Sequence, residues 1–169
     1  MERARASFHR LVDEASDADL ARSSNGTRWT NQQLLFHMLF GYLIVRALRT
    51  LIGLVSRLPE WVGRAWALLL DAATIPFDAA NYAGSCLGGT VLGPRRQAVL
   101  FDRVIAALHR RLDAETDADL SRGMPYPTRW DPFFTPYTTL ADLYRFPTRH
   151  FEFHRAQLSI QPPGRDRSG

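Results

Sequence analysis

Lysine is absent from the sequence, and all 21 basic residues are arginines. One explanation is a GC-rich genome, because arginine codons are GC-rich. The other is a phosphate-binding surface, because the guanidinium fork matches phosphate oxygens. The arginines are scattered, with no run longer than two, whereas a nucleic-acid surface needs a denser basic patch, usually beside aromatic residues. Despite its formal charge of +4, the chain is therefore not expected to bind nucleic acid.

Cysteine and long apolar segments are also scarce. The single cysteine, Cys86, excludes an internal disulfide and a thiolate metal cluster, and it fits a reducing compartment. The charge-free run of residues 30–45 begins with four polar residues, so it falls short of the roughly 20 apolar residues that cross a bilayer. The charged start, MERARASFHR, does not resemble a secretory signal. We therefore expect a cytoplasmic protein that does not enter membranes.

The length and composition bound the number of domains. A chain of 169 residues with 46% apolar and 22% charged residues is typical of one soluble domain with a sizeable core. We expect that domain to cover residues 1–160. The end of the chain has two prolines and a glycine before a charged segment, which predicts a flexible tail over residues 161–169.

Apolar residues recur with the helical period in four stretches, residues 4–15, 34–48, 101–112 and 140–158. Thr30 with Gln33, and Thr139 with Asp142, form capping-box patterns that predict the starts of the second and fourth helices. No stretch alternates strictly enough to predict a strand. The pattern predicts an all-α protein built as a four-helix bundle. Pro147 lies in the fourth stretch, so that helix either begins there or, as the continuing period favours, is kinked there.

The sequence contains an internal repeat. FHRLVDEASDADLAR (8–22) aligns with LHRRLDAETDADLSR (108–122) at a constant offset of 100, and TRW follows each copy. We interpret the repeat as two helix–loop–helix halves related by a pseudo-two-fold axis, in which His9 and His109 are equivalent structural residues. The middle of the chain, residues 58–94, is less regular: EWVGRAWALLL is expected to be helical and the glycine-rich AGSCLGGTVLGP to be a loop.

Two histidines in FPTRHFEFHRAQL, His150 and His154, are four residues apart and point from the same face of a helix. They fall on its apolar stripe, and a buried imidazole needs hydrogen-bond partners or a metal, because an unsatisfied buried polar group costs about 1–3 kcal/mol. His37 on the second helix, with Gly41 leaving space one turn away, is the candidate third ligand. From the spacing alone, a metal site and a core of hydrogen-bonded histidines both remain open.

Three segments resemble the DinB-like or YfiT-like four-helix-bundle proteins, which include mycothiol-dependent maleylpyruvate isomerases and thiol S-transferases. TRWTNQQLLFHM is similar to the family's tryptophan followed by a helix with one histidine. TLADLYRFPTRHFEFHRAQL is similar to its last helix, with the H-x-x-x-H pair and then a glutamine, here Gln157. The two DADL…RW segments resemble its helix–loop–helix halves. The resemblance spans residues 4–160 but is poor over residues 55–95.

The resemblance implies that His37, His150 and His154 bind a divalent metal, and histidine ligands leave zinc, nickel and iron open as its identity. It also implies a low-molecular-weight thiol and a homodimer. Three histidines leave coordination positions free, which favours chemistry over a structural role. We therefore expect a metal-dependent enzyme of the thiol S-transferase or isomerase type, acting on a small electrophile. The alternative is a non-enzymatic bundle that binds a hydrophobic ligand or a partner protein.

Further side chains are candidates for lining this site. Asn81 and Tyr82 are expected near its mouth, and Tyr144 at its edge or in the core. Arg129 or Arg149 either holds a carboxylate or is a solvated surface arginine. Glu152 is expected to face away from the metal, because it lies two residues from His150 across the helix.

The middle segment leaves two interpretations open. Its aromatic residues either form a pocket wall or fill the core: Trp61, Trp66, Phe77 and Tyr82. Cys86 lies in the expected loop with no histidine nearby in sequence, so it is not expected to be a nucleophile. The apolar stretch of residues 51–70, which contains Arg57 and Arg64, makes peripheral membrane binding a third and less favoured interpretation.

Overall fold

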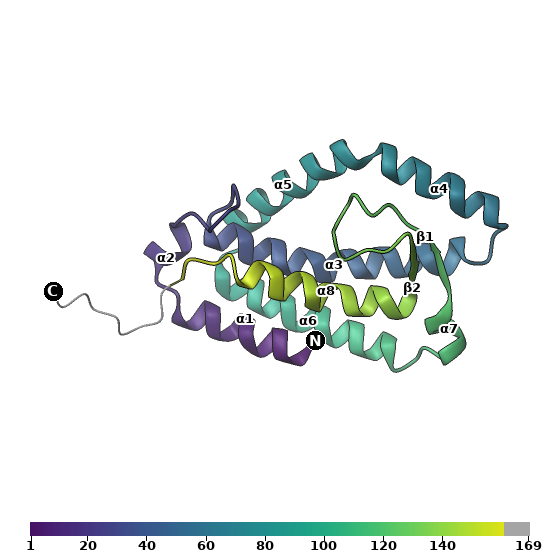
Figure 1. Cartoon of the computed structure of the whole chain (residues 1–169). Helices are drawn as coiled ribbons and strands as arrows, with labels where there is room; N and C mark the ends of the chain where they lie inside the picture. Colours follow the sequence, from purple (N-terminus) through teal and green to yellow (C-terminus); the bar gives the residue numbers. More distant parts are fainter. Residues whose placement is uncertain (161–169) are drawn as a thin grey trace.

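Four long helices, α1, α3, α6 and α8, lie alongside one another in the computed structural model, which describes residues 1–160 (Figure 1). The predicted tail, residues 161–169, lies outside the described residues. The bounds are α1 Glu2–Glu14, α2 Asp17–Ala21, α3 Asn31–Val55, α4 Glu60–Ala72, α5 Thr74–Val91, α6 Pro94–Leu112, α7 Asp117–Ser121, β1 Gly123–Pro125, β2 Tyr137–Thr139 and α8 Leu140–Arg155. The all-α bundle is confirmed. Strands β1 and β2 form one antiparallel pair of three residues each, too short to show as alternation.

Helix α3 is the centre of the bundle and packs against α5, α6 and α8. Residues 34–39 of α3 are buried all round, whereas in its second half the buried residues Val45, Leu48, Ile52 and Val55 lie on one face. Within residues 1–160 it is the one helix long and apolar enough to cross a membrane, a test that core helices also pass. Aromatic rings complete the core: the centroid of Phe101 lies 4.7 Å from that of Phe8 and 4.8 Å from that of Tyr42. All three are fully buried.

The internal repeat is visible as matching contacts in the two halves. His9 Nε2 lies 2.8 Å from an Asp102 carboxylate oxygen, and His109 Nε2 lies 3.0 Å from a Glu2 carboxylate oxygen. Each residue of one pair is 100 positions from its equivalent in the other, so the two contacts join α1 to α6 symmetrically. The two histidines are therefore structural, as predicted.

The short helices α2 and α7 repeat the same local design. Each begins with a capping box, Ser16 with Asp19 and Thr116 with Asp119, and the aspartate also pairs with an arginine three residues later. The predicted capping boxes at Thr30 and Thr139 are confirmed as well, and they fix the starts of α3 and α8. A capping box satisfies two backbone N–H groups that a helix start otherwise leaves unpaired.

The prediction that EWVGRAWALLL is helical is confirmed, whereas the prediction that AGSCLGGTVLGP is a loop is wrong. Residues 60–72 and 74–91 form helices α4 and α5, which Figure 1 shows as an arch alongside α3. The glycines in CLGGTVL permit a close approach between helices. A Cβ added at Gly88 would lie 2.3 Å from the Phe36 ring, and one at Gly89 would lie 2.6 Å from the Gln33 Cα. In a sequence, a glycine at a turn cannot be distinguished from a glycine at a close contact between helices, which is why the sequence predicts a loop here.

Pro147 neither begins nor ends a helix. Helix α8 runs from Leu140 to Arg155 without interruption, so the alternative that it begins at Pro147 is wrong. Its start is set by the Thr139 cap, two turns earlier. The proline leaves one helical hydrogen bond unmade, and α8 retains its buried stripe on both sides, with Leu143 before the proline and Phe151 after it.

Candidate metal centre

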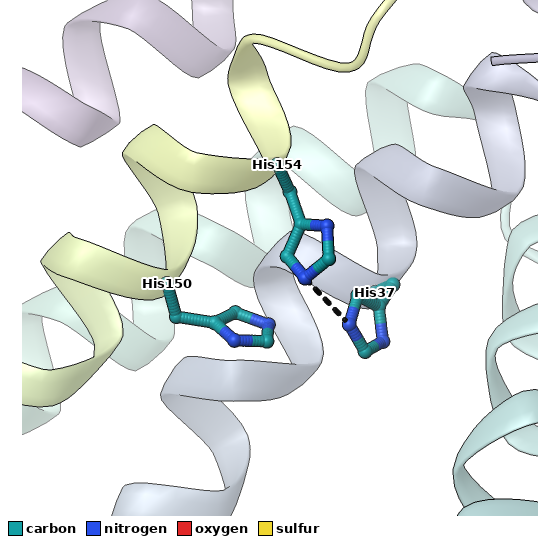
Figure 2. Close-up of side chains that lie close together, drawn as sticks. All are labelled: His37, His150 and His154. Atoms are coloured by element: carbon teal, nitrogen blue, oxygen red, sulfur yellow. Dashed lines mark hydrogen bonds between the residues drawn. The ribbon is translucent and has the colours of Figure 1, made fainter. Parts of the chain in front are cut away.

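Helices α3 and α8 bring three imidazoles together, as predicted. His37 comes from α3, and His150 and His154 come from successive turns of α8 (Figure 2). One nitrogen of each ring lies within 4.8 Å of the others, and the Nε2 atoms of His37 and His154 are 3.2 Å apart. His37 and His150 are only 4% and 6% exposed, and His154 is half-buried. The three histidines thus place their nitrogen donors close together at the edge of the core.

Each ring is held from its far side by an oxygen atom. His154 Nδ1 lies 2.6 Å from Gln157 Oε1, and His150 Nδ1 lies 2.9 Å from Asp131 Oδ2. His37 Nδ1 lies 3.2 Å from Ser85 Oγ. The Gln157 amide oxygen and the Asp131 carboxylate accept hydrogen bonds. The proton of the His154 ring and that of the His150 ring are therefore assigned to Nδ1, which leaves each Nε2 with a free lone pair. Histidines that bind metals are oriented in the same manner.

The protonation states favour metal binding. Burial, reinforced by the two neighbouring imidazoles, lowers the pKa of His37 to about 2. Burial and His150 lower the pKa of His154 to about 4. Both rings are therefore neutral at pH 7, and the neutral imidazole is the form that binds a metal.

One of the three inward-facing nitrogens lacks a hydrogen-bond partner. Within residues 1–160, His150 Nε2 is buried and has no partner. The Nε2 atoms of His37 and His154 are 3.2 Å apart, a distance at which one ring donates a hydrogen bond to the other (Figure 2). A divalent cation between the three rings would satisfy all three atoms. The residues therefore fit a metal, and three imidazole donors suit zinc, nickel or iron.

Two further residues set the position of the rings. The ring of Trp29 stacks on that of His37 with 4.3 Å between centroids. Gly41 leaves the space that His150 occupies: a Cβ at this position would lie 2.9 Å from His150 Cδ2. The space expected at Gly41 from the sequence is thus confirmed. Trp29, which directly precedes the Thr30 cap of α3, packs against the His37 ring.

Two spaces adjoin the histidines. An enclosed chamber of about 30 Å³ reaches His37 and His150, and its other walls are mostly aromatic: Phe40, Phe77, Tyr126, Trp130, Phe134 and Phe146. An open groove of about 420 Å³ reaches His154 and has a polar lining: Thr27, Arg28, Asp78, Asn81, Tyr82 and Gln157. The histidine cluster therefore lies between an apolar space and a polar one.

Several predicted pocket residues are confirmed. Asn81 and Tyr82 line the groove, and Phe77 lines the chamber, where its ring stacks on Trp130 at 3.9 Å. Glu152 faces away from the histidines and pairs with Arg155. Cys86 lines neither space.

Other candidates lie elsewhere. Tyr144 is a core residue, as its second interpretation predicted, and its hydroxyl contacts Arg49 and Glu115. Arg129 is exposed and lies 3.7 Å from Asp71, and Arg149 lines neither space. Trp61 is 68% exposed, so it forms neither a pocket wall nor core. The arginine beside the histidines is instead Arg28, whose guanidinium lies over the Tyr82 ring.

The sequence reasoning missed Ser85 and Asp131. Asp131 follows the second TRW motif in an irregular segment, and Ser85 lies in the helix that was interpreted as a loop. Neither residue has a fixed sequence spacing from the histidine that it contacts. The tryptophan–aspartate step directly after the repeat is the one signal near Asp131, and no pattern marks Ser85.

Replacing Asp131 with asparagine is expected to weaken zinc binding by about 10- to 100-fold, because the amide holds the His150 ring less firmly and leaves its Nε2 less basic. The dissociation constant is measured by competition with a chromophoric chelator. Asp13→Asn, an exposed change on α1, is the matched control and is expected to leave the constant unchanged. An unchanged constant in Asp131→Asn would contradict the role given to this carboxylate.

Comparison with known families supports the same assignment. A family model described as the DinB superfamily matches residues 1–158. Comparison with curated proteins and with solved structures gave no match. The matched region includes all three histidines and the residues that contact their Nδ1 atoms.

Proposed function

The chain belongs to the DinB superfamily, and from this premise we propose that it is a metal-dependent enzyme of the thiol S-transferase or isomerase type. The observation that carries the proposal is the convergence of three imidazoles, in which the low pKa values of His37 and His154 keep both rings neutral and His150 Nε2 is buried without a hydrogen-bond partner. Structural zinc sites usually have four protein ligands, whereas sites with three leave a position open for chemistry. A divalent metal, when bound there, supplies Lewis acidity and favours the thiolate form of a thiol ligand.

In this proposal the thiol binds in the polar groove and the electrophile binds in the aromatic chamber, because the two linings differ in polarity. A polar, low-molecular-weight thiol fits the open groove, where Arg28 and Asn81 are placed to bind a carboxylate or amide. The aromatic chamber is assigned to a small apolar electrophile. Its volume of about 30 Å³ is the share of one water molecule in the liquid, which is too small for an organic molecule. The electrophile therefore enters only after a shift of residues 126–136, which form one wall.

The test is the rate of thiol alkylation. Metal-loaded protein is mixed with a low-molecular-weight thiol and monochlorobimane, whose fluorescence rises when sulfur displaces chloride. We expect a rate well above that of the uncatalysed mixture, no acceleration by His154→Ala, and full acceleration by His9→Ala, a histidine on the far side of the bundle. If fully metal-loaded protein accelerates the reaction of no thiol in a panel of different charge and size, the proposal fails.

The second candidate is a non-enzymatic module that binds a hydrophobic ligand or a partner protein. It is favoured by the exposed apolar side chains of the α4–α5 arch, which include Leu68 at 72% and Ile75 at 79% exposure. Against it, the aromatic chamber reaches two of the histidines. This candidate predicts full metal binding without any thiol chemistry, so the same assay separates the two.

A homodimer is part of the proposal, and the α4–α5 arch is the face best suited to it. No charged side chain occurs over residues 79–94, so two copies can meet across a two-fold axis without like-charge repulsion. We expect light scattering to give the mass of two chains for the wild type and of one for Leu87→Glu, because Leu87 lies within this charge-free stretch and is exposed. Val99→Glu, at an exposed apolar position on α6, is the control and is expected to remain dimeric.

A further inference from the structure

A large hollow lies away from the histidines. It has a volume of about 780 Å³ and runs between α3 and the C-terminal half of α6. Besides Leu43 and Leu108, its lining has small side chains, Ala47, Thr50, Ala107 and Ala114, which leave the space between the two helices unfilled. None of its lining residues belongs to the chamber or to the groove beside the metal centre.

Arginines form the rim of this hollow. Arg46 and Arg49 come from α3, and Arg110 and Arg111 come from the end of α6. A second hollow of about 470 Å³ shares Arg49 and Arg111 with the first and adds Arg57. Its lining also includes Arg122 and two acidic residues, Glu115 and Asp119, which pair with Arg49 and Arg122 respectively. The two form one continuous feature, which we call the arginine groove. From Arg46 to the end of α3 at Val55 is about 14 Å along the helix axis, and Arg57 follows two residues after that end.

Most of these guanidinium groups lack an acidic partner. Arg49 pairs with Glu115, but no carboxylate of residues 1–160 lies within ion-pair distance of Arg46, Arg57, Arg110 or Arg111. The larger hollow has no acidic lining residue. Unneutralised cations on facing helices raise the local concentration of anions and bind phosphate oxygens in a bidentate manner.

We propose that the arginine groove binds a small molecule that carries a chain of phosphate groups. A single phosphate is too short to contact arginines spread along both helices, whereas a linear chain of phosphates reaches several of them. No aromatic side chain lines the larger hollow, so it offers no stacking surface for a nucleobase. The phosphate chain is therefore the part recognised. This site does not depend on the proposed function of the metal centre.

Isothermal titration of the full chain with inorganic triphosphate tests the proposal. We expect saturable binding that is at least about tenfold tighter than that of inorganic phosphate and that weakens when salt rises from about 0.1 M to about 1 M. The double variant Arg46→Gln/Arg111→Gln is expected to lose at least about tenfold in triphosphate affinity, because each removes a charge-assisted hydrogen bond. Adenosine triphosphate is expected to bind about as tightly as triphosphate.

Two controls make the result specific to the groove. Arg3→Gln/Arg10→Gln removes the same charge from exposed positions on α1 and is expected to leave the affinity unchanged. Polyphosphates also bind metals, so a second control removes a histidine of the metal centre. His154→Ala is expected to leave the triphosphate affinity unchanged. Any of three results would overturn the proposal. They are an equal loss of triphosphate affinity in the two double variants, a loss of that affinity in His154→Ala, and much tighter binding of adenosine triphosphate than of triphosphate.

Discussion

Replacing His154 with alanine is expected to remove the bound metal. Wild-type protein purified without a histidine tag should contain about one divalent metal per chain, because three preformed imidazole donors are held by two rigid helices. The variant keeps two donors and also leaves Gln157 without its histidine partner. Its loss of affinity should therefore exceed the roughly 10- to 100-fold that follows removal of a hydrogen-bond partner alone.

Elemental mass spectrometry of both proteins measures this directly, and thermal unfolding gives an independent reading. A ligand that binds only the folded state at about 100 times its dissociation constant stabilises it by about 2.7 kcal/mol. Added zinc should therefore raise the Tm of the wild type and not that of His154→Ala. His9→Ala is the matched control, because His9 contacts Asp102 and lies outside the cluster. Wild type that takes up no zinc, nickel or iron would show that the histidines are a hydrogen-bonded core.

Replacing Gly89 with alanine is expected to separate α5 from α3. The new Cβ would lie 2.6 Å from the Gln33 Cα, and a backbone atom in the first turn of a core helix has little freedom to move. Overpacking of this kind costs about 1–3 kcal/mol. Because α5 carries Ser85, which contacts His37, the displacement should also weaken metal binding.

Gly84 provides a control on the same helix. A Cβ at Gly84 meets nothing within 4 Å, so Gly84→Ala should stabilise α5 by about 0.5–1 kcal/mol, through the helix preference of alanine over glycine. Urea unfolding of both variants measures the two opposite shifts in the free energy of unfolding. If both substitutions stabilise the protein, the close contact between α5 and α3 is not a constraint on the fold.

The sequence predictions are most accurate for interactions between residues that are close together in the sequence. A capping box involves two residues three positions apart, so Thr139 and Asp142 identify the start of α8 from sequence alone. The i, i+4 spacing of His150 and His154 likewise fixes their common face. His37 was a weaker inference, because its place opposite α8 depends on the packing of two helices that are distant in sequence.

By itself, the sequence determined the all-α class, the repeat with its two equivalent histidines, the helix starts and the paired histidines of α8. Each of these depends on residues at most a few positions apart or on direct comparison of the two halves. The tertiary structure alone decided that the glycines of α5 are packing positions, that Asp131 and Ser85 hold the histidine rings, and that scattered arginines from α3 and α6 meet along one groove. Those features join segments dozens of residues apart, and only helix packing sets which of their side chains come within contact distance.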